Sequence, residues 1–121
     1  MQFCWTTIQV SDMKKSLAFY RDILGLPLKR SMKPSDSMEL AFLGEGETEV
    51  ELICSKENPA PSFGKDISLG FIVPSLEAFQ EIMKANKIPL LAGPFQPNPS
   101  IRFLYISDPD GLKIQLVQRL G

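Results

Sequence analysis

Residues 8–20 read IQVSDMKKSLAFY, and within them a strand passes directly into a helix. At the start of this segment apolar residues alternate with polar ones, a pattern typical of a strand with one buried face. Ser11 or Asp12 can cap the helix, and apolar side chains recur after them at helical spacing as far as residue 24. Gly25 is a natural stop for this helix. The segment therefore predicts a strand packed against the helix that follows it.

Beyond this segment, the two halves of the chain have the same order of predicted elements. Each half begins with a strand and a helix, continues with extended segments and ends in a hairpin with glycine in its turn. This order predicts an α+β fold of two tandem βαβββ modules. Strands are expected at 3–10, 26–30, 38–43 and 49–54 in the first half, and at 67–73, 90–93, 102–106 and 112–118 in the second half, where a helix is expected at 76–85.

An internal duplication explains the repeated order. Matching residues of the two halves are separated by an almost constant offset, which chance rarely produces. We therefore expect one domain over 1–121, with a first module at about 1–57, a proline-containing linker at about 58–65 and a second module at about 66–121. The matching pairs are Val10 with Val73 (offset 63), Pro27 with Pro89 (offset 62) and Glu51 with Gln115 (offset 64).

The composition narrows the possible functions. The 121 residues are 44% hydrophobic and 22% charged, which suits one globular domain. The net charge of −1 lacks the clustered positive field that nucleic-acid binding needs. Apolar runs are too short to span a membrane, and residues 1–5 do not resemble a signal peptide. With only two cysteines, we expect a cytoplasmic protein that binds neither nucleic acid nor membrane.

Histidine is absent from the chain. It is the commonest protein ligand of metals and the side chain best suited to proton transfer near neutral pH. Its absence excludes histidine-based catalytic triads and histidine-ligated metal centres within one chain. Any chemistry must therefore use carboxylates, Lys, Tyr, Cys or a bound cofactor.

Two motifs carry a family resemblance that covers essentially the whole chain. Residues 8–20 are followed by LGL at 24–26, and residues 108–116 read DPDGLKIQL. In these motifs the chain resembles the vicinal oxygen chelate superfamily, which includes glyoxalase I, bleomycin-resistance proteins, extradiol dioxygenases and methylmalonyl-CoA epimerase. The resemblance implies paired βαβββ modules whose sheets curl into half-barrel cups, usually in a homodimer.

The resemblance also implies which positions would hold a metal. In the metal-dependent members the first and last strands of each module supply one ligand each. Only one of these four positions, that of a carboxylate, holds a strong metal ligand here. Amide and hydroxyl oxygens bind metals weakly, and an indole N–H donates hydrogen bonds and has no lone pair for a metal. We therefore expect no cofactor, with a divalent metal disfavoured, and a degenerate metal site. The four positions are Trp5, Glu51, Ser68 and Gln115.

Each of these positions has a functional and a structural interpretation. Trp5 is either a stacking platform for an aromatic ligand or a ring that fills the space of the missing metal. Glu51 is a candidate catalytic base if it is buried, since burial disfavours the ionised form of a carboxylate. Otherwise Glu51 is a relic, or a hydrogen-bond partner of Gln115. Ser68 and Gln115 are further candidate ligand contacts.

Other candidates lie outside these positions. Arg102 is expected near a cup wall, where its guanidinium can pair with an anionic ligand. Cys4 and Cys54 are expected to be buried and unreactive, since their strand parity turns them toward a helix. The proline-rich segment 95–99 is expected to be a loop and a candidate lid. Of these, only Arg102 is added to the predicted ligand contacts.

Three functions remain open on these residues. The first is the binding of a small apolar or aromatic molecule in the sheet cup without a metal. The second is a divergent glyoxalase-like lyase or isomerase that uses Glu51 as base or metal ligand. The third is a non-catalytic scaffold dimer. We expect a homodimer in each case, and a small-molecule ligand in the first two.

Overall fold

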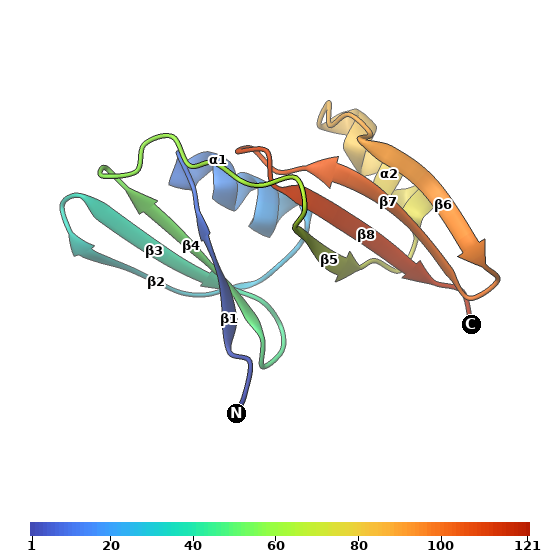
Figure 1. Cartoon of the computed structure of the whole chain (residues 1–121), viewed down its shortest axis with the longest axis horizontal. Helices are drawn as coiled ribbons and strands as arrows, with labels where there is room; N and C mark the ends of the chain where they lie inside the picture. Colours follow the sequence, from blue (N-terminus) through green and yellow to red (C-terminus); the bar gives the residue numbers. More distant parts are fainter. The chain divides into compact units, whose positions relative to one another are not determined.

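The computed structural model describes all 121 residues, which form two compact units, Met1–Ser62 and Phe63–Gly121. Each unit contains a four-stranded sheet and a helical segment. The strand order is β1-β4-β3-β2 in the first sheet and β5-β8-β7-β6 in the second, so the two units share one topology (Figure 1). The predicted α+β fold of two tandem βαβββ modules is thereby confirmed.

In the first unit β1 runs parallel to β4, and the other neighbouring strands are antiparallel. The helical segment after β1 begins as an α-helix and continues as a wider π-helix. The elements are β1 (Trp5–Gln9), α1 (Met13–Leu17), η1 (Ala18–Ile23), β2 (Leu28–Ser35), β3 (Met38–Leu43) and β4 (Glu49–Ser55).

The second unit repeats this arrangement, with β5 parallel to β8 and the other neighbours antiparallel. Its helix is α-helical throughout. None of the helical segments in the chain has the length and apolar character that a membrane span requires. The elements are β5 (Ser68–Ile72), α2 (Leu76–Ala85), β6 (Ala92–Asn98), β7 (Ile101–Ser107) and β8 (Lys113–Arg119).

Both helical segments begin where the sequence predicts. Asp12 is the N-cap of α1, and its carboxylate accepts a hydrogen bond from the Lys15 backbone N–H at 3.0 Å. Ser75 caps α2 in the same way through the Ala78 N–H at 3.1 Å. Each cap satisfies a backbone donor that has no partner within the first helical turn. At the other end of the first segment, Gly25 has a φ of +78°, the left-handed conformation in which the chain leaves the helix.

Alternation along the strands gives each sheet an apolar face that packs in the core with the helix. In the first sheet the strand register aligns Ile8, Leu52 and Ala41, which are at most 2% exposed. In the second sheet Leu116 and Leu104 are aligned and fully buried. Polar, aromatic and some aliphatic side chains occupy the other side of each sheet, which we name the open face. The open faces are therefore where a site can form.

Most of the segment 95–99 belongs to a strand, so the prediction of a loop and a lid there is wrong. It lies in β6, which pairs only with β7 at the edge of its sheet. An edge strand tolerates proline because its outer side supplies no N–H groups to a neighbour. For the same reason β2, the edge strand of the first sheet, extends through Pro34 and past the predicted 26–30.

Candidate functional site

The open face of the first sheet brings Trp5 and Glu51 into one cluster. The register of β1 and β4 aligns Trp5 with Glu49 and Thr7 with Glu51. On the other side of β4, Phe42 of β3 is the cross-strand neighbour of Glu51. Because side chains alternate between the faces of a sheet, these residues share one face, opposite the apolar core row. Three strands thus contribute to the cluster.

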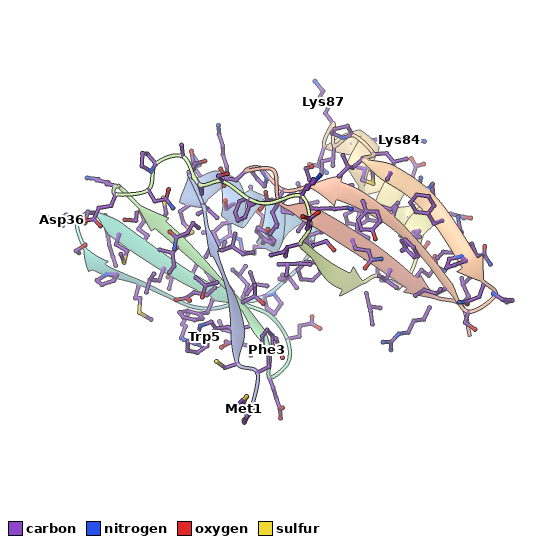
Figure 2. The ribbon with its side chains drawn as sticks, viewed as in Figure 1. Met1, Phe3, Trp5, Asp36, Lys84 and Lys87 are labelled. Atoms are coloured by element: carbon purple, nitrogen blue, oxygen red, sulfur yellow. The ribbon has the colours of Figure 1, made fainter.

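Two aromatic rings pack against each other on this face. The Trp5 ring packs edge-on against Phe42, with centroids 5.3 Å apart and an interplanar angle of 73°. The Arg30 guanidinium lies 4.0 Å from the centroid of Phe42, in a cation–π contact. Phe42 is 5% exposed, whereas Trp5, near the N-terminal end of β1, is 41% exposed (Figure 2). Trp5 therefore presents an accessible ring that is supported by a buried one.

Glu49 holds the arginine that covers Phe42. Its carboxylate accepts two hydrogen bonds from Arg30, at 2.9 and 3.1 Å, and lies 3.7 Å from the ammonium of Lys29. Hydrogen bonding to Arg30 is the main cause that lowers the pKa of Glu49 from its ordinary value. The bidentate pair fixes the guanidinium over the ring, so it also fixes the ring on which Trp5 packs.

Glu51 has a different environment, although it lies on the same strand. It is 9% exposed, and one carboxylate oxygen accepts a hydrogen bond of 2.5 Å from the Thr7 hydroxyl. No lysine or arginine lies within ion-pair distance of this carboxylate. The structure therefore buries Glu51 on the open face, while its role as a base stays a prediction.

The open face of the second sheet carries Ser68 and Gln115 among different neighbours. The Gln115 amide donates a hydrogen bond of 3.3 Å to the Tyr105 hydroxyl. A Cβ at Gly70 would lie 3.3 Å from the amide oxygen, so a larger residue there would press on it. The Lys113 ammonium lies 4.4 Å from the centroid of the Tyr105 ring, and Ser68 is exposed at the start of β5. This face mixes aromatic, polar and aliphatic side chains, and its strands place no carboxylate on it.

The four positions that the resemblance assigns to a metal do not form a metal-binding donor set. They provide one carboxylate, one amide, one hydroxyl and one indole N–H that only donates. Nowhere in the chain do three or more His, Cys, Asp or Glu side chains gather as metal ligands would. Transition metals require several strong donors in a fixed geometry. The residues present therefore do not fit the metal of the metal-dependent family members.

Arg102 does not lie on the predicted cup wall. The register of β7 and β8 aligns it with Gln118, whose side chain accepts a hydrogen bond of 2.9 Å from the Leu76 N–H at the start of α2. Arg102 and Gln118 therefore share the helix-covered face, whereas Gln115 lies on the open face. The predicted place of Arg102 on the cup wall is wrong, because alternation along β7 puts Arg102 on the same side as the buried residues Leu104 and Ile106.

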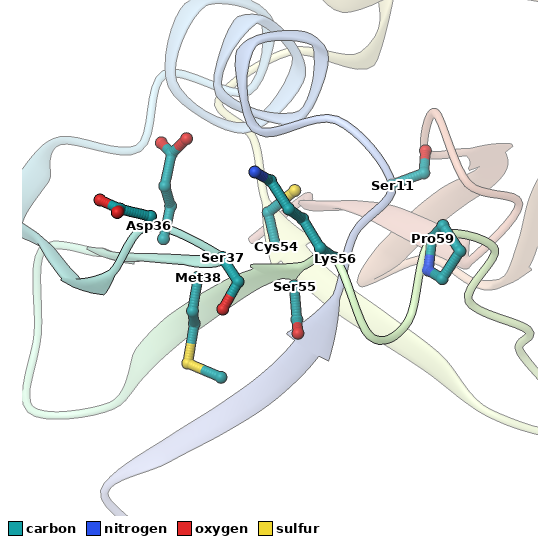
Figure 3. Close-up of a pocket in the computed structure, with 9 residues that line it drawn as sticks. Ser11, Asp36, Ser37, Met38, Cys54, Ser55, Lys56 and Pro59 are labelled. Carbon is teal, nitrogen blue, oxygen red and sulfur yellow. The ribbon is translucent and has the colours of Figure 1, made fainter.

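The two cysteines are more accessible than predicted. Cys4 is exposed because it precedes β1 and lies outside the sheet, and Cys54 is partly exposed near the end of β4. Cys54 lines a cavity of about 200 Å³ together with Lys56 and the carboxylic side chains Asp36 and Glu39 (Figure 3). None of the open-face cluster residues lines this cavity. The prediction of two buried thiols is wrong.

The sequence does not reveal the partners that surround Trp5 and Glu51. Arg30, Phe42 and Glu49 come from three strands and meet only through the register of the sheet. One local signal was available, since Glu49 and Glu51 are two residues apart and therefore share a strand face. That signal places the two carboxylates together but does not show which of them has a cation.

Comparison with known proteins identifies the family. Residues 2–116 match the model of the Glyoxalase/Bleomycin resistance protein/Dioxygenase superfamily. The chain is 36% identical over 121 residues to the uncharacterized protein YwbC of Bacillus subtilis (strain 168), with 94% of each covered. It is 33% identical over 126 residues to lactoylglutathione lyase of Salmonella typhimurium, with 98% of this chain and 93% of the relative covered.

A solved structure shows the same fold at lower identity. TnmS3, an antibiotic binding protein from Streptomyces sp. CB03234, matches with a TM-score of 0.76 and 21% identity, over 98% of this chain and 96% of TnmS3. The family model covers nearly the whole chain, and its two-module architecture is the one described above. The chain therefore belongs to the Glyoxalase/Bleomycin resistance protein/Dioxygenase superfamily.

Proposed function

We propose that the chain binds a small aromatic molecule on the open face of its first module, without a metal. The observation that carries this proposal is the Trp5 ring, which is 41% exposed and packs against the buried ring of Phe42. An accessible indole backed by a second ring offers a large, flat apolar contact of the kind that aromatic ligands use. The resemblance assigns this position to a metal ligand, and an indole cannot serve as one.

The family is compatible with this function but does not decide it. The relative from Salmonella typhimurium is a lactoylglutathione lyase, and TnmS3 is an antibiotic binding protein. One fold therefore occurs in both an enzyme and a binding protein, so the function has to be argued from the site. In this chain the site has an aromatic surface and lacks the donors of a metal centre.

Fluorescence of the single tryptophan tests the proposal. A panel of planar aromatic compounds is titrated into metal-free, tag-free protein, together with saturated analogues of the same size as controls. We expect a saturable change in Trp5 emission for members of the aromatic panel and a weaker response for the saturated analogues. If no aromatic compound gives a saturable change, the proposal is contradicted.

A divergent lyase or isomerase that uses Glu51 is the second candidate function. Two observations favour it. Glu51 is buried, and its carboxylate accepts a hydrogen bond from the Thr7 hydroxyl at one oxygen, which leaves the other oxygen able to accept a substrate proton. The test is turnover in the lactoylglutathione lyase reaction of the relative. Activity that is lost in Glu51→Gln supports this function, and activity that is unchanged in that variant excludes Glu51 as the base.

We also propose that the chain forms a homodimer in the cytoplasm. Both cysteines are free, which suits a reducing compartment. Each sheet has edge strands, such as β2 and β6, that pair on one side only, and dimer formation is a common way to cover such edges. Native mass spectrometry of tag-free protein gives the oligomeric state, and a monomer at micromolar concentration contradicts the proposed dimer.

A further inference from the structure

Glu49 and Glu51 differ in the charge that balances them. Both lie on β4, two residues apart on the open face, and each is 9% exposed. Glu49 is bound by the Arg30 guanidinium at 2.9 Å and approached by the Lys29 ammonium at 3.7 Å. Glu51 has the neutral hydroxyl of Thr7 as its partner. One buried carboxylate therefore has two cations nearby, and the other has none within ion-pair distance.

An ionised carboxylate that is buried without a cation is unfavourable, because the protein removes water from the charge and supplies no opposite charge in its place. Sequences retain such local conflicts mainly at functional sites, where a ligand completes the environment. The residues at the family's metal positions do not fit a transition metal. A ligand that carries its own positive charge can balance Glu51 instead.

We infer that the first module binds a cationic aromatic compound, namely an aromatic ring that carries a protonated amine. The amine pairs with Glu51, and the ring packs on Trp5. This inference rests on the proposed function, which supplies the ring contact, and it adds the charge class of the ligand.

The contacts of the cluster place both parts of this recognition close together. Phe42 is the cross-strand neighbour of Glu51, and Trp5 packs against Phe42 with ring centroids 5.3 Å apart. An ammonium group beside Glu51 therefore lies close to aromatic rings, which also attract cations. The nearest guanidinium on this face, that of Arg30, is engaged in its bidentate ion pair and in covering Phe42. Neither this guanidinium nor any other cation lies within ion-pair distance of Glu51.

A matched set of ligands separates the effect of charge from that of the ring. Naphthylethylamine, naphthylethanol and naphthylpropionate share a ring system and are respectively cationic, neutral and anionic at neutral pH. Each is titrated into metal-free wild-type protein by calorimetry. We expect the amine to bind about tenfold more tightly than the alcohol, and the carboxylate to bind weakest, because a charge-assisted pair forms only with the amine.

Two variants with the same change in net charge locate the effect. In Glu51→Gln the preference for amine over alcohol is expected to disappear. In Glu77→Gln, which removes an exposed carboxylate from the second module, the preference is expected to persist. Circular dichroism verifies that both variants are folded. The comparison of amine with alcohol in the wild type tests the inference even if Glu51→Gln does not fold.

The outcomes distinguish this inference from the proposed function. Equal binding of amine and alcohol by the wild type overturns the inference and leaves aromatic binding standing. A preference for the amine that persists in Glu51→Gln also overturns it. If none of the three compounds binds, the inference is overturned, and the fluorescence panel of aromatic compounds decides separately whether the proposed function stands. Zinc or nickel ions are titrated alone as a final control, and metal binding that is lost in Glu51→Gln overturns the inference because a metal then supplies the charge.

Discussion

The open face of each module has its own aromatic ring with a cation over it. In the first module the Arg30 guanidinium lies 4.0 Å from the centroid of Phe42, and in the second the Lys113 ammonium lies 4.4 Å from that of Tyr105. The two rings occupy equivalent strands, β3 and β7, but the cation comes from β2 in one case and from β8 in the other. Both modules therefore have a cation–π contact, but the cation comes from a different strand in each.

The charges around the two rings differ. β4 carries Glu49 and Glu51 where β8 carries Lys113 and Gln115, at an offset of 64 residues. β1 begins with a tryptophan where β5 begins with a serine. Topology and core packing are therefore alike in the two modules, whereas the open faces have diverged. This difference is the reason why we propose a ligand site on the first module and not on the second.

Matched core deletions test whether the two modules are packed alike, and they should have the largest effect. Leu52→Ala in β4 and Leu116→Ala in β8 each truncate a fully buried side chain at equivalent positions. We expect each change to lower the free energy of unfolding by about 2–5 kcal/mol, because each leaves a cavity in its core. Denaturant titration followed by circular dichroism measures the loss. A negligible loss in one variant would show that the cores are not equivalent.

Removal of one hydroxyl from each open face tests the charge difference. Thr7→Val removes the donor to Glu51, and Tyr105→Phe removes the acceptor for Gln115. We expect Thr7→Val to lower the free energy of unfolding by about 1–3 kcal/mol, since it leaves a buried charged group without its partner. For Tyr105→Phe the expected loss is about 0.5–1.5 kcal/mol, because the group left behind is neutral. Equal losses at neutral pH would argue against a special environment for Glu51.

Substitution at the first residue of β1 and of β5 tests which module binds the aromatic ligand. We expect Trp5→Ala to weaken binding about tenfold, or about 1.4 kcal/mol, because the accessible ring is lost. Ser68→Ala at the equivalent position should leave the Kd unchanged. Calorimetry is the appropriate measurement, since Trp5→Ala has no tryptophan fluorescence. A larger loss in Ser68→Ala would assign the ligand to the second module.

Acid stability tests the ion pair between Glu49 and Arg30, which has no counterpart on the open face of the second module, and its effect should be the smallest. Hydrogen bonding to Arg30 holds the pKa of Glu49 below its ordinary value of 4.5. The unfolded chain therefore takes up this proton at a higher pH than the folded protein does, so the contribution of the pair is lost as the pH falls below about 4.5. In thermal melts over this range, Glu49→Gln should lose stability less steeply than wild type. Glu77→Gln should behave as wild type, and a steeper loss in Glu49→Gln would contradict the pairing.

Much of the backbone follows from local sequence. β3 spans Met38–Leu43 and α2 spans Leu76–Ala85, the ranges that alternation and helical spacing predict. The N-cap at Asp12 and the last turn, in which Gly111 has a positive φ, also lie where the sequence predicts a cap and a glycine turn. These features are predictable because they depend on side chains and backbone groups within a few residues of each other. Strand parity alone likewise places Glu51 on the open face.

Only the tertiary structure decided which side chains meet across the strands and how exposed they are. Arg30 on β2 donates to Glu49, which lies 19 residues later in the chain, and the Leu76 N–H donates to Gln118, which lies 42 residues later. The exposure of Cys4 depends on where its sheet begins. Local spacing determines which residues share a face, but register is set by contacts between distant segments. The unequal charge balance of two neighbouring glutamates is therefore a property of the folded sheet.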